Sequence, residues 1–508
     1  MQILWLKRDL RLQAHAALNQ AQSNVQTDGP VLVLYIHEPS PLAREDVSAQ
    51  HCAFIEETLC DLRQDLGRHN GTLCECVGEA VDVLERLWHA TGFTRVWAHQ
   101  ESTQGQSFER DKAVHAWCHL KGVTFIEVEQ NGVRRGSAYR KQGFGFKEHL
   151  ESSCIAQEVA TAAPCQEVRC FARSPWPRPD LSELLRGRGK DKAARLRGGR
   201  SAALRVLTDF LQVDKLMDYP RSISSPNTAV DGCSRLSPYL AYGVLSDREV
   251  FSKLNELVER EVVYLPPAEA QALSAGVKFL AERLYWRSAY LQSFENKVES
   301  EFVNDLPAFD GERESELAPE WLEAWQEGRT GYPLVDAAMR MLAHTGWLNM
   351  RMRGMVTSFA LNELWLPWRL VGLHLAREFL DYEPGIHWSQ LQIHAGTSRL
   401  SGPLTYNTLK QAQDHDACGI FVKTWLPALK DVPTEHIIEP WKMPPSVQRI
   451  AGCQIGSDYP APIVSLAAAH DAARQRVSAL REGRPVPALL YWRQRAQALR
   501  AQRQDSLF

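Results

Sequence analysis

The sequence lacks any apolar run long enough to cross a membrane, and it lacks an apolar leader of the secretory type. Its apolar opening, Met1–Leu6, is followed at once by the charged triplet Lys7–Asp9. A membrane-spanning helix needs about 20 apolar residues, and a signal peptide needs a longer apolar stretch than this one. We therefore expect a cytoplasmic protein without membrane contact.

Cysteine is scarce, with 11 among 508 residues, and no Cys-x-x-Cys pair occurs. A zinc ribbon or a thioredoxin-type site would need such closely spaced pairs. The nearest approach to one is Cys74-x-Cys76. We expect reduced, mostly buried thiols and no bound metal.

The charges show no strong excess of either sign, since 58 Lys and Arg residues against 61 Asp and Glu residues leave a net charge of −3. A nucleic-acid surface would therefore have to be a local basic patch. With 508 residues, 44% hydrophobic and 23% charged, the chain has a globular composition and room for two or three domains. Its 15 tryptophans suit flat ligands and stacked bases, although tryptophan is also a core residue.

The first third of the chain alternates short β-type runs with helical patterns. The runs that predict strands are Gln2–Leu6, Val31–Ile36, Arg95–His99 and Val123–Val128. Apolar spacings of three and four predict helices between them, as in Phe54–Leu66 and Val81–Leu87. This alternation predicts an α/β domain over residues 1–161, with a parallel, Rossmann-like sheet between two layers of helices. No Gly-x-Gly-x-x-Gly follows any of these strands, so the dinucleotide fingerprint is missing.

Residues 162–200 are rich first in proline and then in glycine and basic residues, which predicts an interdomain linker. Its basic cluster could contact phosphate, although a solvated connection is the commoner use of such sequence. Strand patterns almost vanish beyond it, and residues 201–508 are expected to form a larger, all-helical domain. The clearest helical periodicity runs through Phe279–Tyr290, Val335–Leu342, Met355–Trp365 and Leu370–Leu380.

Two stretches of the helical half point to chemistry from their residues alone. Gly232–Tyr239 places two serine hydroxyls and backbone N–H groups just before a helix that begins with proline. This arrangement suits either a phosphate or a plain helix cap. In Glu282–Arg287, two arginines, Arg283 and Arg287, share one helical stripe, which alone would indicate a salt-bridged helix surface.

With further motifs, these stretches make the sequence similar to the DNA photolyase/cryptochrome family of FAD flavoproteins. In chain order, the motifs are Leu4-Trp-Leu-Lys-Arg-Asp-Leu-Arg-Leu12, Ser234-Arg-Leu-Ser-Pro238, Tyr285-Trp-Arg287, Thr330-Gly-Tyr-Pro333, Val335-Asp-Ala-Ala-Met-Arg340, Thr345-Gly-Trp347, Trp425-Leu-Pro-Ala-Leu429 and Glu439-Pro-Trp-Lys442. They cover nearly the whole chain. The resemblance implies an N-terminal antenna domain, a helical domain that holds FAD, and room for a second chromophore whose identity the sequence leaves open.

The resemblance also assigns residues to the cofactor. Arg353 and Asp381 are expected to form an ion pair against the flavin, and Glu383 to accept the flavin N3–H. His387 falls opposite N5, where photolyases usually carry Asn, and a histidine there could titrate near neutral pH. The residues expected near the pyrophosphate are Tyr219, Ser234, Leu236 and Ser237. The full set expected to hold FAD adds Arg235, Arg283, Trp347 and Met350 to those named above.

The sequence departs from the family's relay of three tryptophans, which leads electrons to the flavin. Its inner position is Leu391 here, its middle position is Trp368 and its outer position is Ser315. Photoreduction of the flavin is then either lost or slow, or it follows another path. The residues that could carry such a path are Trp388, Trp365 and Tyr382.

The face expected to bind substrate also differs from that of known photolyases. The positions that line the lesion pocket of cyclobutane-dimer photolyases are Met350, Gly354 and Ile393 here, which predicts a roomier pocket. The two histidines of (6-4) photolyases are absent. Trp286 is retained and would stack on a flipped lesion. The cations expected to hold DNA around the mouth are Arg287, Arg399 and Lys410. The helical half carries only Cys233, Cys418 and Cys453, too few for the iron–sulfur cluster of one subgroup.

From these residues we predict a monomeric FAD flavoprotein that repairs UV-induced pyrimidine dimers in DNA by electron transfer from excited, reduced FAD. Its catalytic residues would be Trp286, His387 and Trp368, and the type of lesion stays open. The alternative is a cryptochrome-like blue-light photoreceptor that signals through a protein partner and repairs nothing. The altered substrate face favours this alternative.

Overall fold

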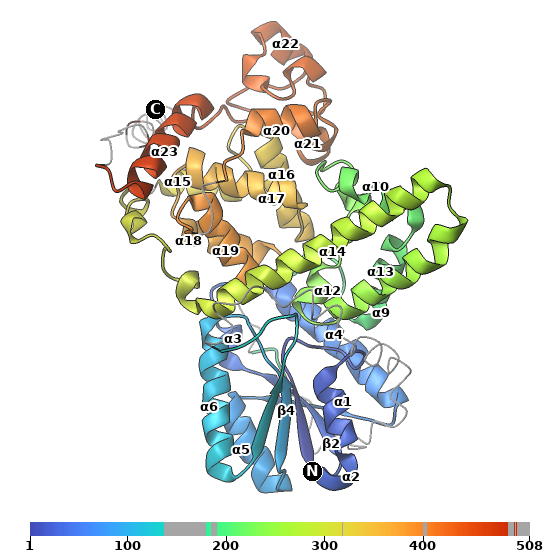
Figure 1. The fold of residues 1–508 in the computed structure, drawn as a ribbon. Coiled ribbons are helices and arrows are strands. Elements are labelled where there is room, and N and C mark those ends of the chain that lie inside the picture. The colour runs from blue at the N-terminus through green and yellow to red at the C-terminus, as the bar shows by residue number, and fades with distance from the viewer. Residues whose placement is uncertain are drawn as a thin grey trace.

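The computed structural model describes residues 1–136, 179–183, 190–316, 318–399 and 404–485, together with Trp492 and Gln494. An α/β unit that contains the N-terminus lies below a larger helical unit in Figure 1. This arrangement confirms the predicted fold class. Most of the predicted linker, 162–200, lies outside the described residues.

The N-terminal unit is built on one parallel sheet with strand order β3-β2-β1-β4-β5. Its strands are β1 (Gln2–Leu6), β2 (Val31–His37), β3 (Leu73–Val77), β4 (Arg95–His99) and β5 (Thr124–Val128). The sequence predicted four of them. It missed β3, because Glu75 interrupts an apolar run that contains two cysteines. Glu75 is nevertheless buried, and its carboxylate oxygens lie 2.7 Å from Arg63 Nε and 3.2 Å from His37 Nε2.

Helices cover both faces of the sheet, and β1 shows why. Ile3 and Trp5 pack on one face with apolar residues of α5 and α6, whereas Leu4 and Leu6 pack on the other with residues of α1 and α4. Successive side chains of a strand point to opposite faces, so a continuous apolar run produces two buried faces. The helices of this unit are α1 (Ala16–Ser23), α2 (Val25–Asp28), α3 (Pro39–Leu42), α4 (Ala49–Arg68), α5 (Ala80–Thr91) and α6 (Gly105–Lys121).

The second unit is helical throughout its described part, apart from one isolated bridge between Ile455 and Tyr459. Its longest helix, α14 (Pro267–Asn296), runs diagonally across the middle of Figure 1 and packs against α10, α13 and α19. The helices before it are α9 (Arg200–Phe210), α10 (Val213–Ser222), α11 (Ala229–Gly232), α12 (Ser237–Ala241) and α13 (Asp247–Glu261). Those after it are α15 (Pro319–Gln326), α16 (Pro333–Thr345), α17 (Met350–Ser358), α18 (Trp368–Glu378), α19 (Pro384–Ala395), α20 (Thr408–His415), α21 (Ile420–Trp425), α22 (Pro445–Ile450) and α23 (Leu466–Arg481).

The predicted helix over Met355–Trp365 differs from the observed backbone. The α-helix α17 ends at Ser358 and continues as a π-helical turn over Phe359–Glu363. Trp365 then takes a left-handed φ of 52°, which is uncommon for a bulky residue and ends the helical path. Apolar spacing alone does not distinguish α-helical from π-helical turns.

Arginine and lysine side chains join the two units at the carboxyl end of the sheet. Arg8, just after β1, donates to the carbonyls of Ala241 (2.9 Å) and Tyr382 (3.0 Å). Arg195 of the predicted linker is buried, and its guanidinium donates to both carboxylate oxygens of Glu57. Lys192 pairs with Glu378. Lys192 and Arg195 are therefore used inside the protein, whereas the side chain of Arg197, paired with Glu57, is 59% exposed. Arg186 and Arg188 of the same basic cluster lie outside the described residues.

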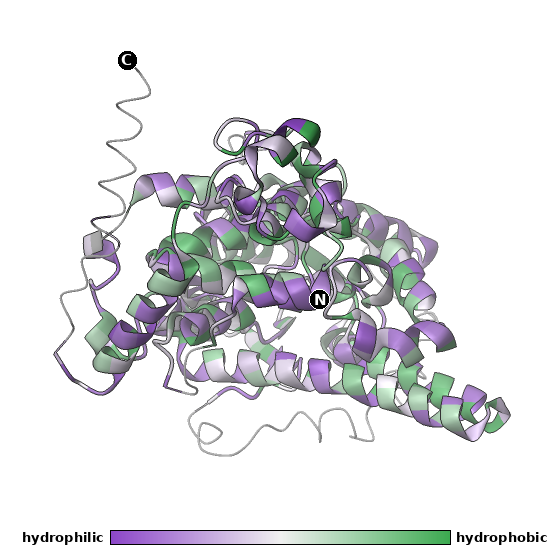
Figure 2. Cartoon of the chain, turned by 90° about the horizontal axis from the view of Figure 1, so that it is seen from above, coloured by the Kyte–Doolittle hydropathy of each residue, from purple (hydrophilic) through white to green (hydrophobic). Residues whose placement is uncertain are grey.

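Within the described residues, no helix combines the length and the apolar character that a membrane span requires. Hydrophilic and hydrophobic residues alternate along the helices in Figure 2. This is the pattern of helices with one face on a core and one face exposed.

Candidate active site

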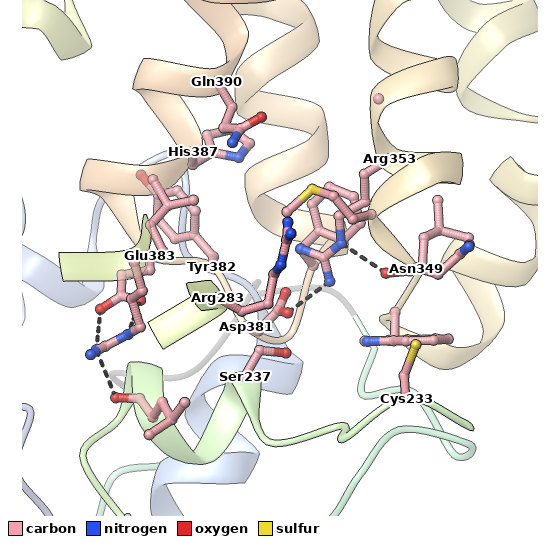
Figure 3. Close-up of a pocket in the computed structure, with 18 of the residues that line it drawn as sticks. Cys233, Ser237, Arg283, Asn349, Arg353, Asp381, Tyr382, Glu383, His387 and Gln390 are labelled. Carbon is pink, nitrogen blue, oxygen red and sulfur yellow. Dashed lines mark hydrogen bonds and ion pairs between the residues drawn. The ribbon is translucent and has the colours of Figure 1, made fainter. Parts of the chain in front are cut away.

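The helical unit encloses a cavity of about 280 Å³ between α10, α14, α17, α19 and the segment that leads into α12 (Figure 3). Residues from distant parts of the chain converge on it. Eleven of the residues predicted to hold FAD line this cavity: Tyr219, Ser234, Leu236, Ser237, Arg283, Trp347, Met350, Arg353, Asp381, Glu383 and His387. The sequence therefore located the cavity, although several of these residues have different partners from those expected.

The predicted ion pair is present. Arg353 of α17 donates from Nη2 to Asp381 Oδ2 at 2.7 Å, and its Nε donates to the Leu348 carbonyl at 2.8 Å (Figure 3). The guanidinium also lies 4.0 Å from the Phe379 ring centroid, so its position is fixed on three sides. The second carboxylate oxygen, Asp381 Oδ1, is buried and has no hydrogen-bond partner among the described residues. A buried acceptor of this kind calls for a donor from a bound molecule.

Hydroxyls and one cation lie along another wall of the cavity. Ser234 and Ser237 stand on either side of the turn that starts α12. Arg283 also lines the cavity, and it forms no ion pair with any described residue. The expectation for Arg235 is corrected: φ of 53° turns its side chain onto the Trp347 ring at 4.2 Å, and Arg235 does not line the cavity.

Glu383 has a protein partner that the sequence did not predict. Arg287 donates to both of its oxygens, from Nε at 3.0 Å and from Nη2 at 2.6 Å. Arg287 is only 8% exposed and also lines the cavity. Its charge is therefore used inside the protein, and the expectation that it holds DNA phosphates at the mouth is wrong. Each carboxylate oxygen of Glu383 accepts one hydrogen bond from Arg287 and keeps a second lone pair, which could accept a flavin N3–H.

His387 lines the cavity from α19, as predicted, but it does not titrate near neutral pH. Burial lowers its pKa to about 4. Its Nε2 lies 2.9 Å from the Gly372 carbonyl, which only accepts, so this nitrogen carries the proton and Nδ1 is an acceptor. The expectation of a neutral-range switch is therefore wrong, because the apolar surroundings disfavour the charged ring.

The mouth of the cavity is not roomier at Gly354, contrary to expectation. The Tyr406 ring fills the space that a side chain at position 354 would occupy, since a Cβ there would lie 2.9 Å from Tyr406 Cε2. Met350 lines the cavity and is 52% exposed, so it marks the rim. Ile393 is buried and is not among the lining residues.

The other residues predicted to contact DNA lie at the surface. Trp286 is 51% exposed, and its neighbours along α14, Arg283 and Arg287, both line the cavity. Arg399 is exposed and donates to the Asp305 carbonyl. Lys410 is exposed, 3.3 Å from Asp414 one helical turn away, which is the arrangement of a solvated surface charge.

Aromatic rings continue from His387 into the protein. Trp388 lies edge-on to His387 with ring centroids 4.9 Å apart, and Trp368 lies edge-on to Trp388 at 5.8 Å. Trp368 and Trp388 are buried, and neither lines the cavity. Trp365 instead stacks on Trp492 at 5.1 Å. The residues that could replace the missing electron relay thus fall into two groups. Trp388 and Trp368 form a chain that starts beside the cavity, whereas Trp365 packs with Trp492 away from that chain.

Cysteines do not gather into a cluster site in the part of the chain that the structure describes. Cys233 lines the cavity, Cys418 is exposed and Cys453 is buried. Among the described residues, one group of metal-ligand side chains forms, Asp9, His15 and His99, in the N-terminal unit. Asp9 Oδ2 lies 3.0 Å from the His15 ring and 2.8 Å from the His99 ring.

Two family models match the chain. Residues 2–145 match the DNA photolyase model, and residues 279–479 match the FAD binding domain of DNA photolyase. The chain belongs to the photolyase/cryptochrome family. Its helical unit therefore carries the family's FAD-binding domain, which supplies most of the cavity lining, whereas lining residues between Tyr219 and Leu240 precede the matched range.

Known members of the family cover almost the full length of the chain. The deoxyribodipyrimidine photo-lyase of Alkalihalophilus pseudofirmus is 27% identical, over 94% of this chain and 97% of that protein. Cryptochrome-1 of Aedes aegypti is 26% identical, over 94% of this chain and 93% of that protein. The crystal structure of a class III photolyase from Agrobacterium tumefaciens is 25% identical and superposes with a TM-score of 0.76, over 95% of this chain and 98% of that one. These relatives are named photo-lyase and cryptochrome, so the similarity shows the family and leaves the activity to be argued from the site.

The residues present suit FAD. Arg283 and the serine hydroxyls would meet the pyrophosphate, because they offer a free cation and hydrogen-bond donors along one wall. The unpartnered Asp381 Oδ1 would accept from a flavin N–H or ribitol O–H. Apolar side chains line much of the remaining cavity, among them Leu240, Leu280, Leu284 and Ile386.

A second, smaller cavity of about 130 Å³ lies between the two units. Tyr35, Glu38 and Arg110 line it from the sheet side, and Tyr242 and Tyr382 line it from the helical side. Burial raises the pKa of Glu38 to about 7, although the positive charge of the neighbouring Arg110 acts to lower it. A second antenna chromophore, which the family allows, would find both aromatic and hydrogen-bonding side chains here.

Several residues at or next to the cavity were missed from the sequence. Asn349 lines the cavity, and its amide donates to the carbonyls of Ile223 and Ser224 at 3.0 Å, which ties α17 to the end of α10. Tyr406 covers Gly354 from a segment that carries no recognisable motif. Tyr382 was named only as an electron path, yet it lines both cavities. Its position between two charged motif residues, Asp381 and Glu383, was the available signal.

Proposed function

We propose that this protein is a light-dependent deoxyribodipyrimidine photo-lyase, which repairs UV-induced pyrimidine dimers in DNA. The observation that carries the proposal is a cavity lined by the residues expected to hold FAD, next to the stretch of α14 on which Trp286 is 51% exposed between the lining residues Arg283 and Arg287. An exposed tryptophan is costly in water, and a flat ring on a helix that lines a flavin cavity is suited to stack on a base that has left the duplex.

FAD bound in the cavity would supply the light-driven one-electron chemistry of the family. The protein's own residues would bind the cofactor and orient the substrate. Arg353 and Asp381 hold opposite charges in a fixed place, and Trp286 replaces the stacking that a flipped dimer loses. His387 stays neutral at physiological pH and presents Nδ1 as an acceptor. Because Arg287 is buried against Glu383, phosphate binding falls to exposed cations such as Arg399 and Lys410.

A repair assay tests the proposal. Chemically reduced protein is mixed with oligonucleotides that carry either a cyclobutane dimer or a (6-4) product, and the mixture is irradiated with blue light. We expect restored bases with one of the two lesions and none in the dark. Protein that carries reduced flavin and restores neither lesion would refute repair.

The second candidate is a cryptochrome-like photoreceptor, and two observations favour it. Tyr406 fills the space over Gly354, and Arg287 is withdrawn from the surface by Glu383. Both changes reduce what the mouth offers to a lesion. A photoreceptor would bind damaged and intact DNA equally, and light would change its conformation or its binding of a protein partner.

We propose that the repair protein acts as a cytoplasmic monomer on UV-damaged DNA. Size-exclusion chromatography with light scattering, with and without lesion-bearing duplex, would measure both the oligomeric state and the stoichiometry of the complex.

A further inference from the structure

Tyr382 occupies an unusual place, because its side chain lines the flavin cavity and the second cavity at once. Figure 3 shows it among the residues of the flavin cavity. It is only 4% exposed. Its hydroxyl donates to Asp46 Oδ2 at 2.7 Å and accepts the indole N–H of Trp388 at 3.1 Å. The ring lies edge-on to His387 with centroids 5.1 Å apart.

Asp46 is an ionised acceptor. Burial opposes its charge, but Arg44 donates to both of its oxygens, from Nε at 3.0 Å and from Nη2 at 2.9 Å, and the pKa of Asp46 is lowered as a net result. Arg44 also donates to Glu301 at 3.2 Å. One arginine thus contacts two carboxylates, those of Asp46 and Glu301.

The other tyrosine and tryptophan side chains that line the flavin cavity lack this arrangement. They are Tyr219 and Trp347. The Tyr219 hydroxyl has no carboxylate within hydrogen-bonding distance among the described residues, and Trp347 packs under the Arg235 guanidinium, whose positive charge disfavours removal of an electron. A phenol is a good one-electron donor only when a base takes its proton, because the oxidised phenol is a strong acid.

We propose that Tyr382 and Asp46 form a proton-coupled electron donor that serves the flavin cavity in place of the missing relay positions. The proposal rests on FAD occupying that cavity, and the oxidant is a photo-excited, oxidised flavin. Tyr382 loses one electron to it, the phenolic O–H bond breaks, and a new O–H bond forms at Asp46 Oδ2. The products on the protein are a neutral tyrosyl radical and a neutral aspartic acid. A thiol in solution later returns the electron, and Asp46 returns the proton.

The surrounding charges favour this transfer. Once Asp46 is protonated, Arg44 keeps its ion pair with Glu301, so no buried charge is left without a partner. The indole N–H of Trp388 then donates to the radical oxygen and holds it in place. Leu391 and Ser315, the two departures from the tryptophan relay, cannot be oxidised, so an oxidisable residue directly on the cavity wall fills a chemical gap.

The test compares four proteins with bound, oxidised flavin: the unmutated protein, Tyr382→Phe, Asp46→Asn and Tyr332→Phe. Tyr332 is the matched control, since it is buried and its hydroxyl donates to a backbone carbonyl, that of Val464, rather than to a carboxylate. Blue-light pulses are followed by transient absorption and by electron paramagnetic resonance, which identify a tyrosyl radical by its spectrum. Flavin content is measured for every variant from its absorbance.

We expect the unmutated protein and Tyr332→Phe to form a neutral tyrosyl radical and to reduce the flavin in the presence of a thiol. Tyr382→Phe should lose the radical, and Asp46→Asn should lose most of it, because an amide accepts the hydrogen bond but not the proton. Formation of the radical in the unmutated protein should also be slower in D₂O, a result that does not depend on whether a variant folds.

A tyrosyl radical that persists in Tyr382→Phe, or an unmutated protein that forms only tryptophan radicals, would overturn the proposal. Repair is scored separately with chemically reduced protein. Failure of repair alongside loss of the radical in Tyr382→Phe would therefore refute the repair function and leave the donor pair standing.

Discussion

The two sides of the flavin cavity differ in how closely they follow the family. On the inner side, the Arg353–Asp381 pair and the serines before α12 stand where the motifs place them. On the outer side, Gly354, Ile393 and Leu391 stand where the resemblance expects other residues, and Tyr406 covers Gly354. The motif residues expected to hold the cofactor are therefore kept, whereas the positions expected to receive substrate and electrons carry other residues.

Physical chemistry explains why the inner side changes less. A buried charge must keep its partner, and a change to either member of the pair leaves the other uncompensated. At the rim, water can solvate whatever a substitution exposes, and an aromatic ring such as Tyr406 can move into a space vacated by a side chain. The cofactor side and the outer side are therefore expected to respond differently to substitution.

The largest effect is expected on the cofactor side. Asp381→Ala leaves Arg353 unpaired, at a cost of about 3 kcal/mol, the low end for such pairs because the Arg353 side chain is 21% exposed. The variant should purify largely without flavin and unfold at lower denaturant concentration. Glu439→Gln, which removes an exposed pair with Lys442, is the control and should change stability by less than about 1 kcal/mol. Full flavin occupancy in Asp381→Ala would contradict the assignment of the pair.

His387 gives a pH-dependent prediction. Its pKa is lowered from 6.5 to about 4 by burial, so below pH 6.5 the unfolded chain binds a proton that the folded protein does not. Stability should therefore fall as the pH drops from 6.5 to 4. In His387→Asn, the loss of unfolding free energy between pH 6.5 and pH 4 should be smaller by about 3 kcal/mol. Denaturant unfolding at several pH values, with the exposed His119→Asn as control, measures the slope; an unchanged slope in His387→Asn would show that His387 titrates normally.

On the outer side, Trp286→Ala should erase the preference for damaged DNA, with a loss of about 1–3 kcal/mol, while flavin content and weak, salt-sensitive binding remain. Tyr264, 83% exposed at the end of the 3-10 helix Val262–Tyr264 between α13 and α14, offers a control aromatic residue away from the cavity lining. Fluorescence anisotropy with lesion-bearing and intact duplexes gives both affinities. Equal affinities in the unmutated protein would remove the repair proposal and favour the photoreceptor.

The smallest effect is expected for Trp368→Phe. Trp368 lies behind Trp388 and does not line the cavity, whereas Tyr382 does. Photoreduction under blue light with a thiol should therefore proceed at nearly the unmutated rate. If the flavin of Trp368→Phe no longer photoreduces, the electron path runs through this tryptophan and the rerouting idea is wrong.

The fold was largely predictable because periodicity reports directly on which face of an element is buried. The alternation of Ile3 and Trp5 with Leu4 and Leu6 illustrates this, as does the loss of strand patterns after residue 200. The exception, β3, has a buried glutamate whose compensation by Arg63 and His37 comes from elsewhere in the chain. Sequence patterns within a strand do not show such partners.

The candidate site was predictable where a motif fixes backbone and charge together, as at Arg353 and Asp381. It was not predictable where the partner comes from a segment without a motif. Tyr406 over Gly354 and Asp46 beside Tyr382 are both of this kind. Arg287 was misassigned because its position on a helix does not show that it pairs with a buried carboxylate, Glu383, from another segment.

The most direct test of the central claim combines one variant from each side of the cavity with two starting redox states of the flavin. Blue-light repair of lesion-bearing oligonucleotides is measured for the unmutated protein, Asp381→Ala and Tyr382→Phe, each started either chemically reduced or oxidised with a thiol. We predict that Tyr382→Phe repairs when it starts reduced and fails when it starts oxidised, and that Asp381→Ala fails in both states for lack of flavin. Full repair by Asp381→Ala, or failure of the chemically reduced, flavin-loaded Tyr382→Phe when the unmutated protein repairs, would contradict a division between cofactor binding and electron supply.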